Sequence, residues 1–229
     1  MAIKRHIRNL LAQAGLPVGQ VEKTAYQQGD YSVWEVVDDS TIEGPEDSPY
    51  QWAQIEIRSP IKANTQASLD EVQKVCDLLK ASYHIETNQS TGLHVHVGRG
   101  SNSFEHQQIR NLIAFYWVFE EQIKTALGQF RSQSTMAQFS RDNSRYAHKY
   151  WQNNAHHTKA ENVTAWIADQ ANPYRDTDKY TSLNLTGVRE EANQPGRADS
   201  KPTVEFRSHE GSIEGVRVIN WIKAVVGMV

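Results

Sequence analysis

The stretch TGLHVHVG, residues 91–98, alternates apolar and polar side chains with a period of two. In an extended chain the apolar side chains share one face, and they are Leu93, Val95 and Val97. His94 and His96 share the opposite face. The stretch therefore predicts a strand with an aliphatic back and a histidine front, and two interpretations of that front stay open. It is either the solvent-facing side of a half-buried strand or a pair of metal ligands.

Three further segments have the same two-faced design, namely residues 54–59 (QIEIRS), 182–186 (SLNLT) and 203–209 (TVEFRSH). Their apolar side chains are Ile55, Ile57, Leu183, Leu185, Val204 and Phe206. Their polar side chains are Glu56, Arg58, Ser182, Asn184, Thr186, Thr203, Glu205, Arg207 and His209. Laid side by side, the four predicted strands form a mainly antiparallel sheet with an aliphatic back and a polar front.

Helical spacing of apolar residues predicts the layer that covers this back. We expect helices near residues 1–14, 68–83, 104–127, 161–170 and 212–229. Ser68 and Glu71 match a capping box, which places the start of the second helix at Ser68. The inward stripe predicted for the longest helix is Ile109, Leu112, Tyr116, Phe119, Ile123 and Leu127. The predicted fold class is α+β, with the helices packed on the apolar face of the sheet.

A polar segment without a clean period, residues 128–159, interrupts this pattern. Structureless segments of this length are uncommon in compact domains unless they are functional, so we expect a loop or lid within a single domain of residues 1–229. Its basic residues have two open interpretations, contact with an anionic substrate or solubility of the loop. They are Arg131, Arg141, Arg145 and Lys149.

Composition narrows the classes of partner. A net charge of −3 gives no general attraction to nucleic acid or to an anionic membrane surface. No apolar run reaches about 18 residues, so no membrane span is expected. The single cysteine, Cys76, excludes an internal disulfide framework and fits a cytoplasmic protein. Cys76 also lies on the apolar stripe of its predicted helix, where it reads as a core residue rather than a nucleophile.

The polar front differs in kind from an ordinary solvated face. It carries no lysine and concentrates carboxylates, imidazoles and arginines. Carboxylate oxygens and neutral imidazoles suit a divalent cation, whereas arginines suit phosphate or carboxylate oxygens held by two hydrogen bonds. The simplest function for this combination is a sheet surface that binds metal and holds a polyanion, and the alternative remains a polar face in water.

The segments QIEIRSP, TGLHVHVG, YTSLNL and TVEFRSHEGSIEGVRVINWI, in this order, resemble the putative amidoligase family common in fungi, which is related to glutamine synthetase and the glutamate–cysteine ligases. VWEVVDDSTI, residues 33–42, also resembles a strand of that family. The resemblance implies a catalytic sheet like that of those ligases. It further implies Glu56, His94 and Glu205 as metal ligands, His96 as a nucleotide or metal ligand, Arg207 as a phosphate-binding residue, and Arg58, Asn184 and His209 as substrate-orienting residues.

The activity implied by the resemblance is ATP-dependent formation of an amide bond. A substrate carboxylate is converted to an acyl phosphate, which an amine then attacks, with Mg²⁺ or Mn²⁺ bound at the site. The substrates implied are small-molecule or peptide carboxylates and amines.

The sequence departs from that pattern at its start. The paired-carboxylate strand Gly-x-Glu-x-Glu with which such sheets usually begin is not present, although Glu35, Asp38 or Asp39 can contribute. We therefore expect a version shortened at both ends that lacks the first strand. Two other functions stay open, an inactive remnant that binds a nucleotide or peptide, and a metal-dependent hydrolase that works without ATP.

Overall fold

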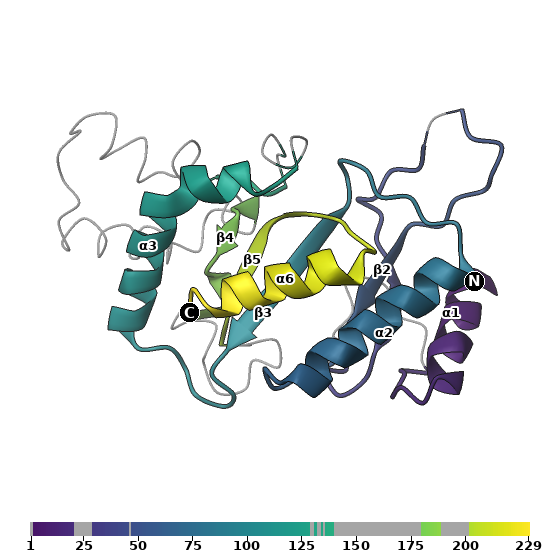
Figure 1. Ribbon diagram of the computed structural model, residues 1–229, viewed down its shortest axis with the longest axis horizontal. Coiled ribbons are helices and arrows are strands. Elements are labelled where there is room, and N and C mark those ends of the chain that lie inside the picture. The colour runs from purple at the N-terminus through teal and green to yellow at the C-terminus, as the bar shows by residue number, and fades with distance from the viewer. Residues whose placement is uncertain are drawn as a thin grey trace. The chain divides into compact units, whose positions relative to one another are not determined.

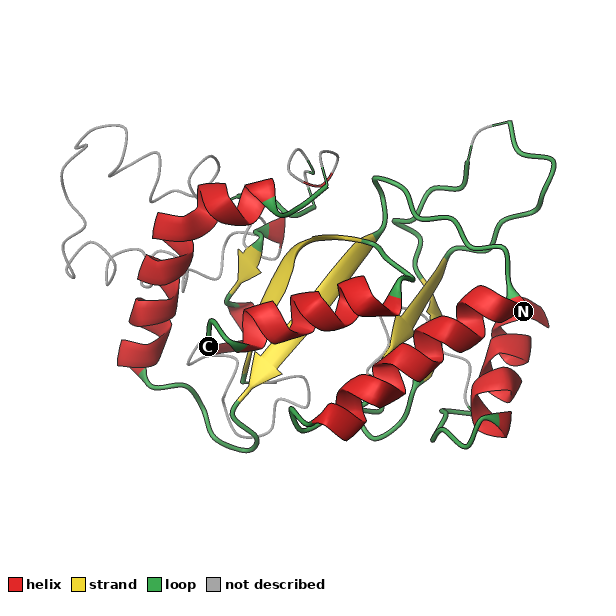
Figure 2. Ribbon diagram, in the orientation of Figure 1, coloured by secondary structure: helices red, strands yellow, loops and turns green. Residues whose placement is uncertain are grey.

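The computed structural model describes residues 2–20, 29–45, 47–128, 131, 134, 136–139, 180–188 and 202–229. By its internal contacts the chain divides into two compact units, residues 1–91 with 212–220 and residues 92–211 with 221–229. Within the described residues the regular structure consists of four α-helices, one 3₁₀ turn and two small antiparallel sheets (Figures 1 and 2). This composition agrees with the predicted α+β class.

The first unit combines two helices with a two-stranded sheet. The helices are α1 (Ala2–Gln13) and α2 (Gln66–Ser82), and the strands are β1 (Glu35–Asp38) and β2 (Ile55–Arg58). The strands pair antiparallel, with Glu35 opposite Arg58. Apolar residues from all four elements and the neighbouring loop form the core, and its buried members are Ile7, Leu11, Leu16, Val18, Trp34, Val36, Val75 and Leu79. Ile55 and Ile57 pack against this core, as their alternation predicts.

Helix α2 begins earlier than the sequence predicts. Its N-cap is Thr65, whose side chain accepts a hydrogen bond from the backbone N–H of Ser68 at 3.3 Å. The capping box of Ser68 and Glu71 is therefore wrong. The Glu71 carboxylate instead accepts a hydrogen bond from the indole of Trp34 at 2.7 Å and pairs with Lys62 at 2.8 Å, so it ties the helix to the residue that precedes β1.

The first unit buries a cysteine thiol on α2 and two basic side chains on α1. Cys76 is 7% exposed, and burial raises the pKa of its thiol to about 11, which confirms a core residue. Lys4 and Arg8 of α1 are each 6% exposed, and Lys4 pairs with Asp38 of β1.

In the described part of the chain no helix combines the length and the apolar character needed to cross a membrane.

The second unit contains the sheet that carries the predicted polar front. Its strands are β3 (Gly92–Gly98), β4 (Leu183–Asn184) and β5 (Thr203–Glu210), and β5 lies between the other two and is antiparallel to both (Figure 1). Helix α3 (His106–Thr125), the turn η4 (Thr186–Val188) and the part of α6 (Gly215–Val226) from residue 221 onward complete the unit. The four predicted strands thus occupy two sheets, because β2 pairs with β1.

The core of this unit lies on the aliphatic back of the sheet. Leu93, Val95 and Val97 pack against it, as predicted. Its fully buried members include Ile113, Tyr116, Val204, Phe206 and Val225. Phe119, which the sequence places on the inward stripe of α3, is 43% exposed and stacks on Phe115 instead.

An irregularity in the pairing of β3 with β5 decides which way the end of β5 faces. Val95 lies opposite Phe206, but Leu93 lies opposite His209, so β5 uses one residue more than β3 over this span. Such an extra residue is a β-bulge, and it reverses the alternation of faces beyond it. Alternation read from the sequence therefore fails after Ser208.

The bulge moves His209 from the predicted polar front to the core side. The His209 ring lies 5.2 Å from the ring of Trp221 in the core, and its Nδ1 lies 2.7 Å from the backbone oxygen of Glu210. The preceding Ser208 also faces the core, where its hydroxyl accepts a hydrogen bond from Tyr116 at 3.4 Å. The prediction that His209 lies on the polar front is therefore wrong.

Candidate functional site

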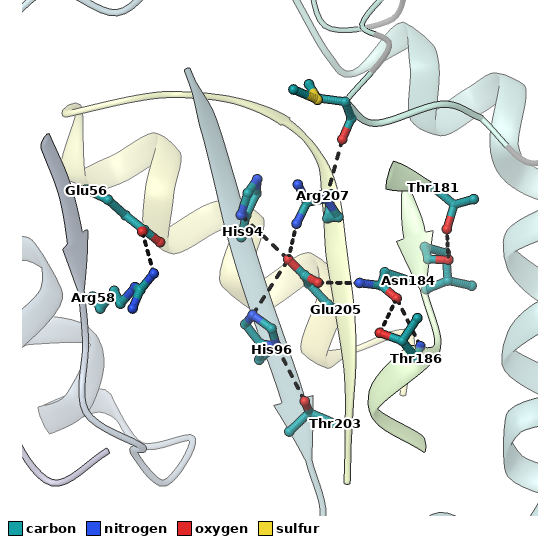
Figure 3. Close-up of polar contacts among 12 residues, drawn as sticks. Glu56, Arg58, His94, His96, Thr181, Asn184, Thr186, Thr203, Glu205 and Arg207 are labelled. Atoms are coloured by element: carbon teal, nitrogen blue, oxygen red, sulfur yellow. Dashed lines mark hydrogen bonds and ion pairs between the residues drawn. The ribbon is translucent and has the colours of Figure 1, made fainter. Parts of the chain in front are cut away.

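The register of the three-stranded sheet sets Glu205 at the centre of a polar row. His96 of β3 and Asn184 of β4 both lie directly opposite Glu205 of β5. Residues opposite each other in adjacent strands point to the same face, so the three side chains share the front of the sheet. Figure 3 shows this arrangement, with Glu205 between the side chains of its two neighbouring strands.

Both carboxylate oxygens of Glu205 accept short hydrogen bonds. Arg207 donates from Nη1 to Oε1 at 2.6 Å, and Asn184 donates from Nδ2 to Oε2 at 2.6 Å. The amide oxygen of Asn184 in turn accepts from the backbone N–H and the hydroxyl of Thr186, at 2.9 and 2.8 Å. These bonds fix the orientation of Asn184 and hold the Glu205 side chain, which is 10% exposed, in one position.

Two histidine rings approach the same carboxylate oxygen. Nδ1 of His94 lies 3.5 Å from Oε1 of Glu205, and Nε2 of His96 lies 3.7 Å from it. Partial burial and the positive charge of Arg207 lower the pKa of His94 to about 4, although Glu205 opposes this shift. His94 is therefore neutral near pH 7, the form in which imidazole binds a metal ion.

Glu205 is ionised under the same conditions. Burial by itself raises the pKa of this carboxyl, but the charges of His96 and Arg207 and the hydrogen bond from Arg207 outweigh burial, so that the pKa lies below its usual value. The front of the sheet thus presents an anionic carboxylate, a neutral imidazole and an arginine within one cluster.

A second arginine, Arg131, supports this cluster through the backbone of Arg207. It is 2% exposed, and its guanidinium donates from Nε and Nη2 to the backbone oxygen of Arg207 at 3.2 and 2.8 Å. Burial and the charge of Arg207 lower its pKa to about 10, which leaves it charged near neutral pH. Gly92 makes room for this group, because a Cβ there would meet the guanidinium and also lie 3.0 Å from Nε2 of His94. Arg131 therefore anchors the backbone that carries Arg207.

The remaining predicted site residues fall into two groups. Glu56 and Arg58 lie on β2 in the first unit, where Arg58 donates to the Glu56 carboxylate at 2.8 Å. They are not among the residues that the second unit brings together. Most of the predicted lid at residues 128–159, including Arg141, Arg145 and Lys149, lies outside the described residues, as does the predicted helix at 161–170.

A divalent cation restricts the spacing of the atoms that bind it. Donor atoms held at about 2.1 Å by one cation lie roughly 3.0–3.4 Å from each other, slightly closer than the nitrogen–oxygen pairs at 3.5 and 3.7 Å. Among the residues that the structure describes, no three His, Cys, Asp or Glu side chains form a metal-binding group. Within the described residues, Glu205 with His94 and His96 therefore comes near the spacing of cation ligands without forming a complete cation site.

A family model described as putative amidoligase enzyme matches residues 4–229 of the chain. The chain belongs to this amidoligase family. The match supports a ligase-type enzyme. Neither the search of curated proteins nor the search of solved structures found a match. The assignment to the amidoligases therefore rests on the family model and on the residues themselves.

Sequence reasoning found the central residues of the site but missed their supports. Alternation placed His94, His96 and Glu205 on one face, and contacts within the second unit agree. The position of Arg131 carries no local signal, because its partner is the backbone of a residue 76 positions away. This support matters for the cluster, since it fixes the backbone that carries Arg207.

Proposed function

We propose that this chain is an ATP-dependent carboxylate–amine ligase, and that the Glu205 cluster of the second unit is its nucleotide-phosphate site. The observation that carries the proposal is the joint presence of an ionised Glu205, a neutral His94 and the charged Arg207 on one sheet face. The carboxylate and the neutral imidazole are groups that coordinate a divalent cation, and the arginine donates hydrogen bonds to phosphate oxygens. A sheet related to those of glutamine synthetase and the glutamate–cysteine ligases is part of this proposal.

Each residue of the cluster has a proposed task. Glu205 and His94 hold a divalent cation, Mg²⁺ or Mn²⁺, which when bound neutralises charge on phosphate oxygens. His96 lies beside them, with its Nε2 3.7 Å from Oε1 of Glu205. Arg207 holds the transferred phosphate, and Asn184 keeps Glu205 in place through its hydrogen bond at 2.6 Å. His209 has no task here, because its ring packs against the core.

The proposed reaction has two steps. An oxygen of the substrate carboxylate attacks the γ-phosphorus of ATP, and the bond from the γ-phosphorus to the oxygen that bridges it to the β-phosphate breaks. The products are ADP, which leaves with that oxygen, and an acyl phosphate. The amine nitrogen then attacks the acyl carbon, the carbon–nitrogen bond forms, and phosphate leaves with the electrons of the carbon–oxygen bond. The amine nitrogen loses a proton to water as the amide forms. Arg207 stabilises the negative charge of the phosphoryl group in both steps.

The proposal is tested by calorimetric titration of ATP, with and without magnesium, into the wild-type chain and into Glu205→Gln, His94→Gln and Arg207→Lys. Glu86→Gln is the matched control, because Glu86 is an exposed carboxylate of the first unit. We expect magnesium-dependent binding that the control keeps and the three variants weaken by at least tenfold. Thermal unfolding of each variant establishes that it is folded at the titration temperature. A folded wild-type chain without magnesium-dependent ATP binding overturns the proposal.

One observation favours a second candidate, a nucleotide-binding protein without ligase activity. The described residues provide no metal-binding group of three side chains, and a sparse cation site lowers the charge stabilisation available for phosphoryl transfer. The two candidates differ in phosphate release. A chain that binds Mg²⁺ and ATP but releases no phosphate with any mixture of carboxylates and amines supports the second.

A further inference from the structure

A small cavity opens beside Glu205 on the front of the sheet in the second unit. Its volume is about 100 Å³. It is lined by His96, Asn184, Thr186, Gly187, Thr203 and Glu205. Figure 3 shows His96 and Thr203 on one side of the Glu205 carboxylate, and Asn184 and Thr186 on the other side. None of the tasks proposed above places a substrate group in this cavity.

The size of the cavity limits what can enter it. A cavity needs about 10–15 Å³ to hold one water molecule, whereas sites for whole drug-sized ligands measure about 300–1,000 Å³. At about 100 Å³ the cavity beside Glu205 accepts a group of a few heavy atoms. It therefore suits the head group of a substrate rather than a nucleotide or a peptide segment.

The lining of the cavity favours a positively charged donor. Glu205 contributes carboxylate oxygens, and none of the six lining residues is a lysine or an arginine. The hydroxyl hydrogen of Thr186 is directed to Asn184 at 2.8 Å, which leaves its lone pairs to accept. Thr203 contributes a second hydroxyl, 3.4 Å from Nδ1 of His96. A carboxylate or phosphate entering here meets a like charge, whereas an ammonium group finds several acceptors.

We infer that this cavity binds the head group of the amine substrate as a primary ammonium, an inference that rests on the ligase function proposed above. The amine is thereby held next to Glu205, beside the cluster assigned to phosphate. The substrate class is a primary amine whose carbon next to nitrogen carries little bulk.

The test is saturation-transfer NMR on the full chain with methylammonium chloride as the probe. Measurements are made with and without magnesium and a non-hydrolysable ATP analogue. Tetramethylammonium chloride is the matched cation, because it has the same charge but no N–H donor. Thr186→Val and Thr203→Val each remove one hydroxyl from the cavity. Thr181→Val is the control variant, because its hydroxyl bonds to the backbone oxygen of Leu183 and does not line the cavity.

We expect methylammonium to bind and tetramethylammonium not to bind. The dissociation constant of methylammonium should rise about tenfold in Thr186→Val and in Thr203→Val, which is the usual order for losing one hydrogen bond to a charged group. It should stay unchanged in Thr181→Val. Equal binding to all variants, or no binding by the wild type in either condition, overturns the inference. Titration of ATP with magnesium on the same samples separates the two proposals. If the chain binds ATP but not methylammonium, the amine site is refuted and the proposed function is not. If it binds methylammonium but not ATP, the proposed ligase function is refuted.

Discussion

Replacing Glu205 by Gln tests the physical account of the cluster most directly. The carboxylate has two acceptor oxygens, and each receives a hydrogen bond of 2.6 Å, one from Arg207 and one from Asn184. A glutamine amide has one oxygen and one NH₂ group, so one of the two donors must face another donor. The substitution keeps the shape of the side chain but removes its charge and one of its two bonds.

The cost follows from burial. The Glu205 side chain is 10% exposed and the Arg207 side chain 16%, so solvent screens the pair weakly. Loss of one hydrogen bond to a charged group costs about 1.5–3 kcal/mol, and breaking a buried ion pair costs about 3–5 kcal/mol. We therefore expect the free energy of unfolding of the second unit to fall by about 3 kcal/mol at pH 7. For a chain of this length that corresponds to a decrease in Tm of roughly 6–12 °C.

Differential scanning calorimetry measures this effect, and its pH dependence provides the sharper test. The folded-state pKa of Glu205 lies below its ordinary value of 4.5, so the stabilising contribution is present above pH 4.5 and is lost as the pH falls through the folded-state pKa. The difference between wild type and Glu205→Gln should therefore shrink in acid. The exposed control Glu86→Gln should change stability by less than about 0.5 kcal/mol. A difference below about 1 kcal/mol at pH 7, or one that persists unchanged in acid, refutes the reasoning.

Three further predictions concern other parts of the chain. Gly92→Ala should lower stability by about 2 kcal/mol in thermal unfolding, because the new Cβ displaces the buried Arg131 guanidinium from its hydrogen bonds; an unchanged Tm contradicts this. His94 has a pKa of about 4 in the folded chain against 6.5 normally, so the unfolded chain binds more protons between these values and wild-type stability should fall as the pH drops through this window. In urea unfolding His94→Gln should show a smaller slope over that window, and an equal slope would argue against a neutral His94. Thr65→Ala should cost about 1 kcal/mol by removing the N-cap bond to Ser68, and a loss of less than a few tenths would mean that the cap contributes nothing.

Local pattern predicted most of the elements of the described residues. The alternation in TGLHVHVG gave β3 with its correct back, because the aliphatic residues at 93, 95 and 97 pack on the core. The helical spacing around Cys76 gave α2, although it began at Gln66 rather than at Ser68. Both signals succeed because they depend on neighbours within a few positions along the chain.

The errors arose where structure depends on distant partners. Alternation put His209 on the polar front, and the extra residue of β5 opposite β3 turned it toward Trp221. Whether a strand contains such a bulge depends on its register with the partner strand, and the sequence of one strand alone does not determine that register. In the same way Arg131 looked like a basic residue of a polar loop, and its burial follows from a bond to the backbone of Arg207.

The same core that stabilises the second unit also sets the geometry of its site. Val204 and Phe206 of β5 are fully buried on the back, and Glu205 between them must then face the front. A slip of one residue in this pairing would expose both apolar side chains, at about 1.5–3 kcal/mol each, and would also bury Glu205 in the core without its donors. The alternative register is therefore strongly disfavoured. The row of His96, Glu205 and Asn184 is thus held in place by hydrophobic burial on the other side of the sheet, before any ligand binds.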